Sequence, residues 1–282
     1  MARFEQLARR AALFCGVCAA VLAEQITYHL EPVKPLSRFT SDQRVLLMKL
    51  NRADNANLAR LGHIIVPDRW ERDELVYSPM PQSVPQLSGE SKAIVVDLTA
   101  QVFGAYESGN LVRWGPVSSG RRHHETPPGT YHLNWRARLH VSTEDPTWIM
   151  PWYFNFASDR GLGLHQYSLP GRPASHGCVR MLAVDAKWVF SWGEGWTVAD
   201  AGGEVVELGT LVLVVGKYNH RAPQPWLEPG WWALGASFTV GPIVPFMRAE
   251  VALTLRALAQ EPVPIGTRGQ LPRGGLRAGR AG

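Results

Sequence analysis

The sequence predicts a mainly β protein in which a small helical segment precedes the sheet. Three short runs with period-two alternation, 93–97, 101–106 and 111–119, follow one another without an intervening helix. Turn residues separate them, most clearly at 107–110 (Glu-Ser-Gly-Asn), a sequence typical of a hairpin loop. Such closely spaced strands favour an antiparallel or mixed β-sandwich over a doubly wound parallel sheet.

Composition excludes one class of partner. The chain has 282 residues, 45% of them hydrophobic and 19% charged, which is enough apolar material for a core. Its formal net charge of +5 is concentrated at the ends: three arginines and one glutamate lie in residues 1–23, and four arginines lie in 266–282. The part between is close to neutral and has no basic run interleaved with aromatics, so we expect no nucleic-acid partner.

Residues 1–23 have the pattern of an export signal. Arg3, Arg9 and Arg10 precede the apolar run 11–22, and cleavage is expected after Ala23. The run is shorter than the roughly 20 apolar residues that a bilayer span needs, so no stable membrane span is expected. We therefore expect an exported protein of the periplasm or cell envelope.

The segment after the signal is expected to be small and partly helical. A proline-containing connector, 24–39, leads to 40–70, where leucines at spacings of three and four predict two short helices before a β-prone run at 62–67. This order resembles the second half of a LysM peptidoglycan-binding module. A small helical prodomain that packs on the following domain is the alternative, and whether 40–70 binds glycan stays open.

A proline- and serine-containing linker, 71–90, precedes the main domain, 91–217. Thr126-Pro-Pro-Gly-Thr130 predicts a turn before a strand at 130–135, the segment 182–192 has helical composition, and 211–215 is typical of a buried closing strand. Beyond it we expect a C-terminal wrap and helix, 218–265, and a disordered Gly- and Arg-rich tail, 266–282. The tryptophans of 226–232 favour a packed wrap over a glycan-stacking surface.

Cys178 is the candidate nucleophile. Cys15 and Cys18 lie in the expected signal, which leaves Cys178 without an intrachain partner in an oxidising compartment. A buried structural thiol is the alternative. However, the thiol lies in Ser175-His-Gly-Cys178, and a catalytic cysteine needs an imidazole or backbone donors nearby to favour the thiolate.

The residues around Cys178 suggest roles. His165 is the best general base, and His176, two residues before the cysteine, is expected to share its face in an extended segment and to orient the site or act as auxiliary base. Gly177 allows amide groups to approach an oxyanion, and Ser175 offers an orienting hydrogen bond. Arg180 suits a substrate carboxylate, with a loop-holding ion pair as the alternative.

The motifs resemble the YkuD-type L,D-transpeptidase catalytic domain over about 91–217. The resemblance is carried by Val117-Ser-Ser-Gly120, Thr126-Pro-Pro-Gly-Thr130, Gly163-Leu-His165 and Ser175-His-Gly-Cys-Val-Arg180. The thirteen positions from His165 to Cys178 are fewer than the family usually has, and Arg180 replaces the commoner asparagine. In the family, the aromatic run 148–156 forms part of a lid over the donor groove, so Trp152 and Tyr153 are expected to contact substrate. Tyr167, two residues after His165, is a further candidate for substrate contact.

The resemblance implies an L,D-transpeptidase-like β-sandwich with a helix after the cysteine. It also implies a cofactor-free cysteine acyltransferase of cell wall biogenesis that acts on peptidoglycan stem peptides. Cys178 would form a thioester with a tetrapeptide stem, release D-Ala and pass the acyl group to an amine, making a 3→3 crosslink. With water as acceptor the same residues would give an L,D-carboxypeptidase. We expect a monomer.

Two other classes remain as alternatives. A non-catalytic peptidoglycan-binding protein would retain the fold as a scaffold. A metal-dependent wall hydrolase has little support, because His123, His124, His132, His140 and His220 form no His-Glu-x-x-His or comparable ligand spacing. No metal is therefore expected.

Overall fold

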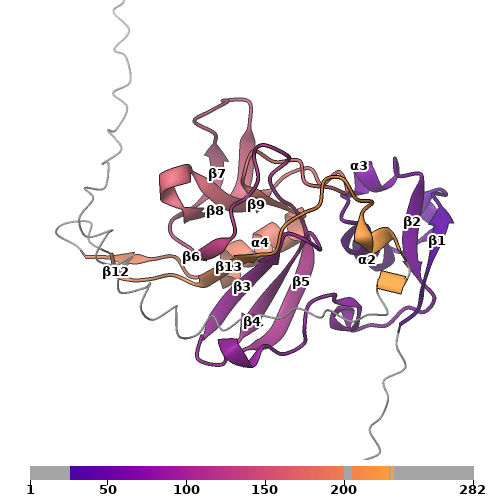
Figure 1. Ribbon diagram of the computed structural model, residues 1–282, viewed down its shortest axis with the longest axis horizontal. Helices are drawn as coiled ribbons and strands as arrows, with labels where there is room; N and C mark the ends of the chain where they lie inside the picture. Colours follow the sequence, from indigo (N-terminus) through magenta and orange to yellow (C-terminus); the bar gives the residue numbers. More distant parts are fainter. Residues whose placement is uncertain (1–25, 200–204, 229, 232–282) are drawn as a thin grey trace, which may run out of the picture.

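The computed structural model describes residues 26–199, 205–228 and 230–231 (Figure 1). The expected signal 1–23, the expected helix within 218–265 and the tail 266–282 lie outside these residues. No helix of the described part has the length and apolar character needed to cross a bilayer.

The N-terminal unit is a small sheet covered by two helices. Its strands β1 and β2 pair antiparallel, from Tyr28 opposite Pro67 to Pro32 opposite His63. The two helices and the second strand confirm what the leucine spacing predicts. The first strand lies inside the segment expected to be a connector, where proline and exposed polar residues conceal a half-exposed edge strand. The elements are β1 (Tyr28–Pro32), η1 (Leu36–Arg38), α2 (Ser41–Asn51), α3 (Asn55–Leu58) and β2 (His63–Pro67).

Local sequence explains the start of α2. The Thr40 hydroxyl accepts a hydrogen bond from the Gln43 amide, and the Gln43 side chain accepts one from the Thr40 amide, which forms a capping box. The helix buries Leu46, Leu47 and Leu50. Because Leu46 and Leu50 pack in one cluster with residues of the main sheet, α2 is attached to the main domain.

The segment 71–90 packs on the main sheet, whereas a linker was expected. It contains η2 (Glu74–Tyr77) and η3 (Pro85–Leu87). Four of its apolar side chains are buried in the same cluster as Leu46 and Leu50; these are Tyr77, Met80, Val84 and Leu87. The prolines there shape two short 3-10 turns instead of an extended spacer.

The main domain contains one nine-stranded mixed sheet in the order β6-β13-β3-β4-β5-β10-β9-β8-β7. Two pairings are parallel, β13 with β3 and β10 with β9, and the others are antiparallel. The expected hairpin at 107–110 and the closing strand at 211–215 are confirmed. The strands are β3 (Lys92–Asp97), β4 (Val102–Glu107), β5 (Asn110–Ser118), β6 (Gly129–His132), β7 (Arg136–Val141), β8 (Ile149–Ala157), β9 (Leu162–Gln166), β10 (Val179–Met181) and β13 (Leu211–Val215).

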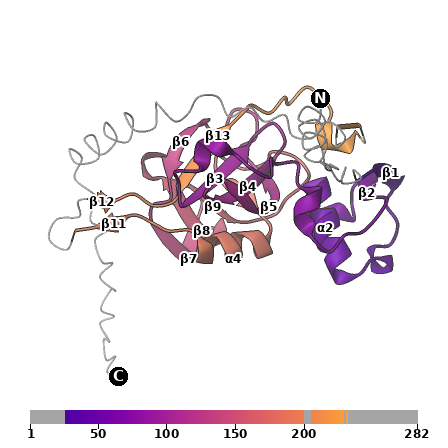
Figure 2. The same cartoon turned by 90° about the horizontal axis from the view of Figure 1, so that it is seen from below.

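The sheet curls around its core, and α4 (Ala183–Trp192) closes the core from one side (Figure 2). One buried cluster joins Ile94 of β3, Phe103 of β4, Phe154 of β8 and Leu164 of β9 with Val189 of the helix. The expectation of a mainly β domain with a helix after the cysteine is confirmed.

A buried polar cluster joins the N-terminal unit to the main domain. Lys49 of α2 is fully buried; its Nζ lies 2.8 Å from Glu74 Oε1, 3.1 Å from the Trp114 carbonyl oxygen and 3.9 Å from Asp185 Oδ1. Asp185, at the start of α4, accepts hydrogen bonds from the Arg113 guanidinium at 2.7 and 2.8 Å. A buried charge that loses its partner is costly, so this cluster fixes α2 and α4 relative to each other.

The described C-terminal part returns to the N-terminal unit. After the hairpin of β11 (Thr197–Val198) and β12 (Val205–Glu207) and the strand β13, the turn η5 (Pro225–Leu227) packs on α2 and β2 (Figures 1 and 2). Trp226 is buried and lies over the Arg52 guanidinium, 5.1 Å from ring centroid to Cζ. The structure thus supports the packed wrap at this tryptophan; Trp232 lies outside the described residues.

Candidate active site

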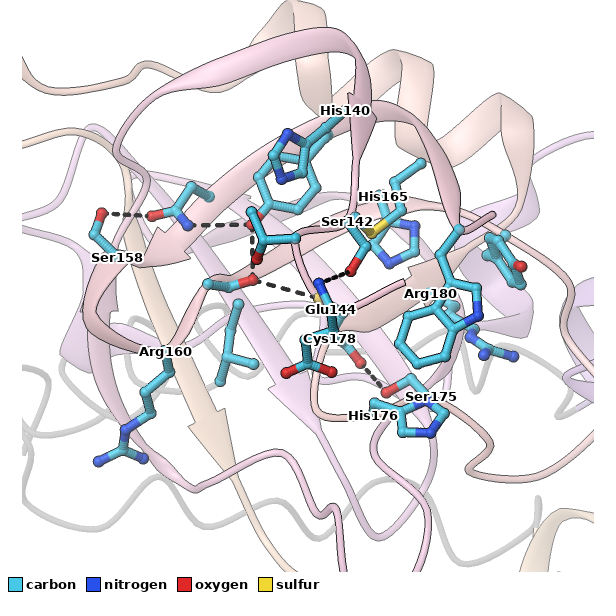
Figure 3. A pocket seen from close by; sticks show the side chains of 18 of the residues that line it. His140, Ser142, Glu144, Ser158, Arg160, His165, Ser175, His176, Cys178 and Arg180 are labelled. Atoms are coloured by element: carbon cyan, nitrogen blue, oxygen red, sulfur yellow. Dashed lines mark hydrogen bonds between the residues drawn. The ribbon is translucent and has the colours of Figure 1, made fainter. Parts of the chain in front are cut away.

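The parallel pairing of β9 and β10 brings Cys178 and His165 together. Arg180 lies opposite His165 in the register, so Cys178, two residues earlier, lies beside Gly163. Gly163 and His165 share one face of β9, because side chains alternate along a strand. Both the thiol and the imidazole therefore point into the same cavity, which is visible in Figure 3.

Hydrogen bonds fix the bend that carries the nucleophile. Ser175 Oγ accepts a hydrogen bond from the Gly177 amide at 3.0 Å and donates to the Cys178 carbonyl oxygen. Gly177 has φ 117°, a conformation that side chains disfavour, and a Cβ there would lie 2.9 Å from Leu162 Cδ2. Thr126 Oγ1 donates to the Gly177 carbonyl oxygen at 2.7 Å, which fixes the peptide plane before Cys178.

This geometry changes the role expected for Gly177. Its amide already donates to Ser175, and its carbonyl accepts from Thr126, so Gly177 orients the peptide plane that includes the Cys178 amide. Sequence reasoning identified the turn at 126–130 but missed that the Thr126 hydroxyl contacts the nucleophile's own peptide.

His165 is buried and has a defined tautomer. Its Nδ1 lies 2.9 Å from the Gln166 carbonyl oxygen, which can only accept, so Nδ1 carries the proton and Nε2 keeps its lone pair. Burial lowers the pKa of His165 from 6.5 to about 4, and the positive charge of Arg180 acts in the same direction. The ring is therefore a neutral imidazole near pH 7, the form that acts as a base.

The thiol is also neutral at rest. Burial raises the pKa of Cys178 from 9.0 to about 11, although a backbone hydrogen bond from Gly163 and the charge of Arg180 act in the opposite direction. The Cys178 thiol donates a hydrogen bond to the Gly161 carbonyl oxygen, with sulfur and oxygen 3.8 Å apart. The site therefore holds a thiol and an imidazole, both uncharged, rather than an ion pair.

Tyr153 forms the floor of the site. Its side chain is fully buried, its hydroxyl donates to the Gly161 carbonyl oxygen at 2.9 Å, and its ring stacks on His165 at 6.1 Å. A Cβ at Gly163 would lie 2.6 Å from the Tyr153 ring, so this glycine makes room for the tyrosine. Tyr153 lines the cavity, and its burial makes it a support for His165 and for Gly161; the expected contact with substrate stays a prediction.

His176 lies at the cavity mouth. The segment 176–178 bends at Gly177, so the extended arrangement expected for His176 and Cys178 is wrong. The His176 ring stacks on Trp148 at 4.3 Å and meets His124 edge-on at 4.8 Å. Desolvation and the charge of Arg121 lower its pKa. This position suits the orientation of lid and substrate, while His165 is the better placed base.

Arg180 presents a cation to the cavity. Its guanidinium lies over the Tyr167 ring at 4.5 Å, and its Nη1 lies 3.5 Å from the Ser168 carbonyl oxygen. Arg180 forms no ion pair with any carboxylate of the described residues, so the loop-holding ion pair considered as an alternative is not formed there. Tyr167 also lines the cavity and orients the arginine; its expected contact with substrate stays a prediction.

Trp152 does not belong to the site, contrary to expectation. Its φ of 55° interrupts the alternation of β8, and its ring packs edge-on against Phe190 of α4 at 5.4 Å. Arg138 lies over the other part of the ring at 4.7 Å. Alternation along 148–156 does not reveal this positive φ, so the contact of Trp152 with the helix could not be predicted from the residue pattern.

The cavity has a volume of about 420 Å³ and extends beyond the motif residues. The hairpin of β7 and β8 covers one side, with His140 and Met150 on its inner face and Trp148 at its tip. Sequence reasoning assigned no role to this hairpin's polar loop, 142–147, because a single sequence does not show where a loop folds back. The loop contributes Ser142, Thr143 and Glu144 to the lining.

The segment between the two motif strands is held by the N-terminal unit. Asp54, between α2 and α3, accepts hydrogen bonds from the Leu169 amide at 2.8 Å and from the Ser168 hydroxyl at 3.0 Å. The Asp54 amide donates to the Leu169 carbonyl oxygen, and the Gly171 amide donates to the Arg52 carbonyl oxygen, both at 3.0 Å. The short spacer thus finds its backbone partners in another unit of the chain.

Residues 91–214 match the family model of YkuD, the L,D-transpeptidase catalytic domain. The YkuD segment covers every strand of the nine-stranded sheet apart from the last residue of β13. The recognition made from the sequence motifs is confirmed. The N-terminal unit lies outside the matched residues.

Several solved structures are similar to the chain. An L,D-transpeptidase from Stackebrandtia nassauensis has 26% identity and a TM-score of 0.37; the match covers 46% of this chain and 57% of that one. An L,D-transpeptidase from Xylanimonas cellulosilytica has 26% identity and a TM-score of 0.43, and the match covers 62% of this chain and 81% of that one. L,D-transpeptidase 1 of Mycobacterium tuberculosis has 21% identity and a TM-score of 0.35, and the match covers 45% of this chain and 63% of that one. No curated protein sequence matches the chain.

Metal ligands do not gather in the described residues, where no group of three or more His, Cys, Asp or Glu side chains is placed to hold an ion.

Proposed function

We propose that this protein is a peptidoglycan L,D-transpeptidase. The observation that carries the proposal is the position of Cys178 beside a neutral, tautomer-fixed His165 in a cavity that also presents the Arg180 guanidinium. The match of 91–214 to the YkuD model supports the choice of reaction class. The donor is a tetrapeptide stem, and Arg180 binds one of its carboxylates by a bidentate contact.

Acylation begins with transfer of the thiol proton to His165 Nε2 as sulfur attacks the carbonyl carbon of the peptide bond before the terminal D-Ala. The Cys178 amide stabilises the oxyanion of the tetrahedral intermediate. The intermediate collapses, the C–N bond breaks, and the departing D-Ala nitrogen takes the proton from the His165 imidazolium. The product is a thioester on Cys178 and a neutral imidazole.

Deacylation reverses these roles. A neutral amine of a second stem attacks the thioester carbon and gives a proton to His165 Nε2. The C–S bond then breaks, and the sulfur recovers the proton, so the thiol and imidazole are regenerated. Water in place of the amine gives hydrolysis and a carboxypeptidase product. Since peptidoglycan lies outside the cytoplasmic membrane, the proposal includes export to the cell envelope.

The test is mass spectrometry of the purified chain incubated with disaccharide-tetrapeptide, beside the Cys178→Ala variant. We expect an acyl-enzyme adduct, release of D-Ala and a crosslinked dimer, all of which the variant lacks. Tripeptide without dimer would identify water as the acceptor. Unchanged substrate and no adduct with both proteins would contradict the proposal and favour a binding protein that retains the fold.

A further inference from the structure

The cavity contains four charged side chains, and three of them are already engaged. Asp159 pairs with Arg160, with Oδ2 and Nε 3.3 Å apart. Arg180 lies over the Tyr167 ring. Glu144, on the loop between β7 and β8, forms no ion pair with any residue that the structure describes, although it lies at the cavity mouth in front of Cys178 (Figure 3).

The loop that carries Glu144 is held in a closed turn. The Ser142 amide donates to the Trp148 carbonyl oxygen at 3.1 Å, and the Trp148 amide donates to the Asp145 carbonyl oxygen at 3.0 Å. Ser142 Oγ accepts from the Glu144 amide at 3.1 Å. The neighbouring Asp145 carboxylate is used within the loop, because it accepts from the Thr147 amide and hydroxyl. Glu144 is therefore the carboxylate that this turn leaves available to a ligand.

The Glu144 charge acts against the nucleophile. It contributes to the raised pKa of Cys178, after burial, and it opposes the lowering of the His176 pKa. A negative charge near a developing thiolate is a cost to acylation. Because the Glu144 carboxylate forms no ion pair with any described residue, the packing of the loop does not explain why a negative charge stands near Cys178.

We propose that Glu144 binds the ammonium group of the acyl acceptor. The inference rests on the proposed transpeptidase function and names the residue that selects its second substrate. Glu144 and Arg180 give the cavity one anionic and one cationic group, which suits an amine-bearing acceptor beside a carboxylate-bearing donor. The ammonium releases one proton to water at the cavity mouth before attack, and His165 takes the second proton as the C–N bond forms.

The test separates the two half-reactions in Glu144→Gln. The donor is a tetrapeptide whose side-chain amine is acetylated, so that it cannot act as acceptor. Mass spectrometry follows the acyl-enzyme, and the acceptors are glycinamide, which is cationic before it reacts, and hydroxylamine, which is neutral. Glu144→Asp keeps the charge, and Glu207→Gln on exposed β12 makes the same change in net charge far from the loop.

In Glu144→Gln we expect the rate of acyl-enzyme formation to be at least that of the unsubstituted chain. Transfer to glycinamide should fall about fivefold relative to hydrolysis, the size of a partly exposed ion pair. Transfer to hydroxylamine should be unchanged, Glu144→Asp should retain most of the glycinamide reaction, and Glu207→Gln should behave as the unsubstituted chain. Added salt should weaken the preference for glycinamide only while Glu144 is present.

An unchanged ratio of glycinamide transfer to hydrolysis in Glu144→Gln would overturn the inference. An equal loss with both acceptors would also overturn it, because a general effect on the loop would then explain the change. Failure of the unsubstituted chain to form any acyl-enzyme would instead remove the proposed function, and the inference with it.

Discussion

Cys178 and His165 meet as two uncharged groups, because burial raises the pKa of the thiol and lowers that of the imidazole. In the proposed reaction, proton transfer must then accompany sulfur attack, since the pair stores no thiolate in advance. The proposal also requires that the bound substrate excludes water and brings its oxyanion next to the Cys178 amide, which would supply the missing stabilisation. The resting thiol is correspondingly protected from unselective reaction.

Alkylation of Cys178 by iodoacetamide tests this neutral pair. A thiol ionises above its pKa, so the rate should be low at pH 7 and should rise towards pH 11, well above the range of an unperturbed cysteine. Mass spectrometry of the modified chain over pH 6–11 gives the profile. A rate that reaches its plateau below pH 8 would show a preformed thiolate and contradict the prediction.

Arg180→Lys tests the proposed contact between this arginine and a carboxylate of the donor. Lysine keeps the charge but loses the planar fork and the stacking on Tyr167, so KM for the donor should rise about tenfold with a smaller effect on kcat. Steady-state release of D-Ala provides the measurement. Arg138→Lys, on the Trp152 side of β7, is the matched control and should leave KM unchanged.

Among the elements, the turn between α2 and α3 has the most direct effect on the site. Asp54 caps α3 through the Asn57 amide at 2.9 Å and also binds the backbone of the segment between His165 and Cys178. One carboxylate thus caps the start of α3 and positions the loop that leads to Cys178. Its hydrogen bonds lower its pKa despite the opposing effect of burial.

Asp54→Ala should destabilise the chain by about 2 kcal/mol, since it removes a helix cap and the hydrogen bonds to the Leu169 amide and the Ser168 hydroxyl. Because the folded-state pKa lies below the unfolded value of 3.8, the stabilisation is present above pH 3.8 and is lost as the pH falls through the folded value. Urea denaturation between pH 3 and 7 measures both effects. A variant whose stability loss is the same at pH 3 as at pH 7 would disagree with this account.

The N-terminal unit and the YkuD segment behave as one body at the scale of the whole molecule. They share a buried apolar cluster, the Lys49–Asp185 contact and the return of η5 onto α2. A boundary in the sequence at 71–90 therefore does not correspond to a boundary in packing. We expect one cooperative unfolding transition.

Trp226→Ala should lower the stability of this single transition by about 3 kcal/mol, because a buried indole that packs on Arg52 is lost. Differential scanning calorimetry of both proteins measures the change. The exposed Val206→Ala serves as control, with a shift close to zero. Two separate transitions, of which only one responds to Trp226→Ala, would show that the units unfold independently.

The sequence was sufficient to predict the elements whose signals are local. The alternating runs, the hairpin at 107–110, the helix after Cys178 and the motif pair of His165 and Cys178 follow from periodicity, turn residues and spacing. Contacts between distant segments were not predictable in the same way. Trp152 leaves the site through one positive φ, and Thr126 reaches Gly177 across 51 residues. Neither the positive φ of Trp152 nor the hydrogen bond of Thr126 alters the residue pattern of its own segment.

The packing of 71–90 and the strand at 28–32 were missed for a related reason. Prolines and exposed polar residues are typical of linkers, but they are equally compatible with 3-10 turns and an edge strand that are stabilised by a neighbouring surface. The expectation that the protein is a monomer stays a prediction.

The dependence of the short spacer on Asp54 and Arg52 limits how the site can be transplanted. A graft of 165–180 into another YkuD domain would carry the nucleophile and base, but the Leu169 and Gly171 amides would lack the acceptors that the α2–α3 turn provides. A design that transfers the short spacer should therefore also transfer the α2–α3 turn, because this turn supplies the hydrogen-bond acceptors for the spacer backbone.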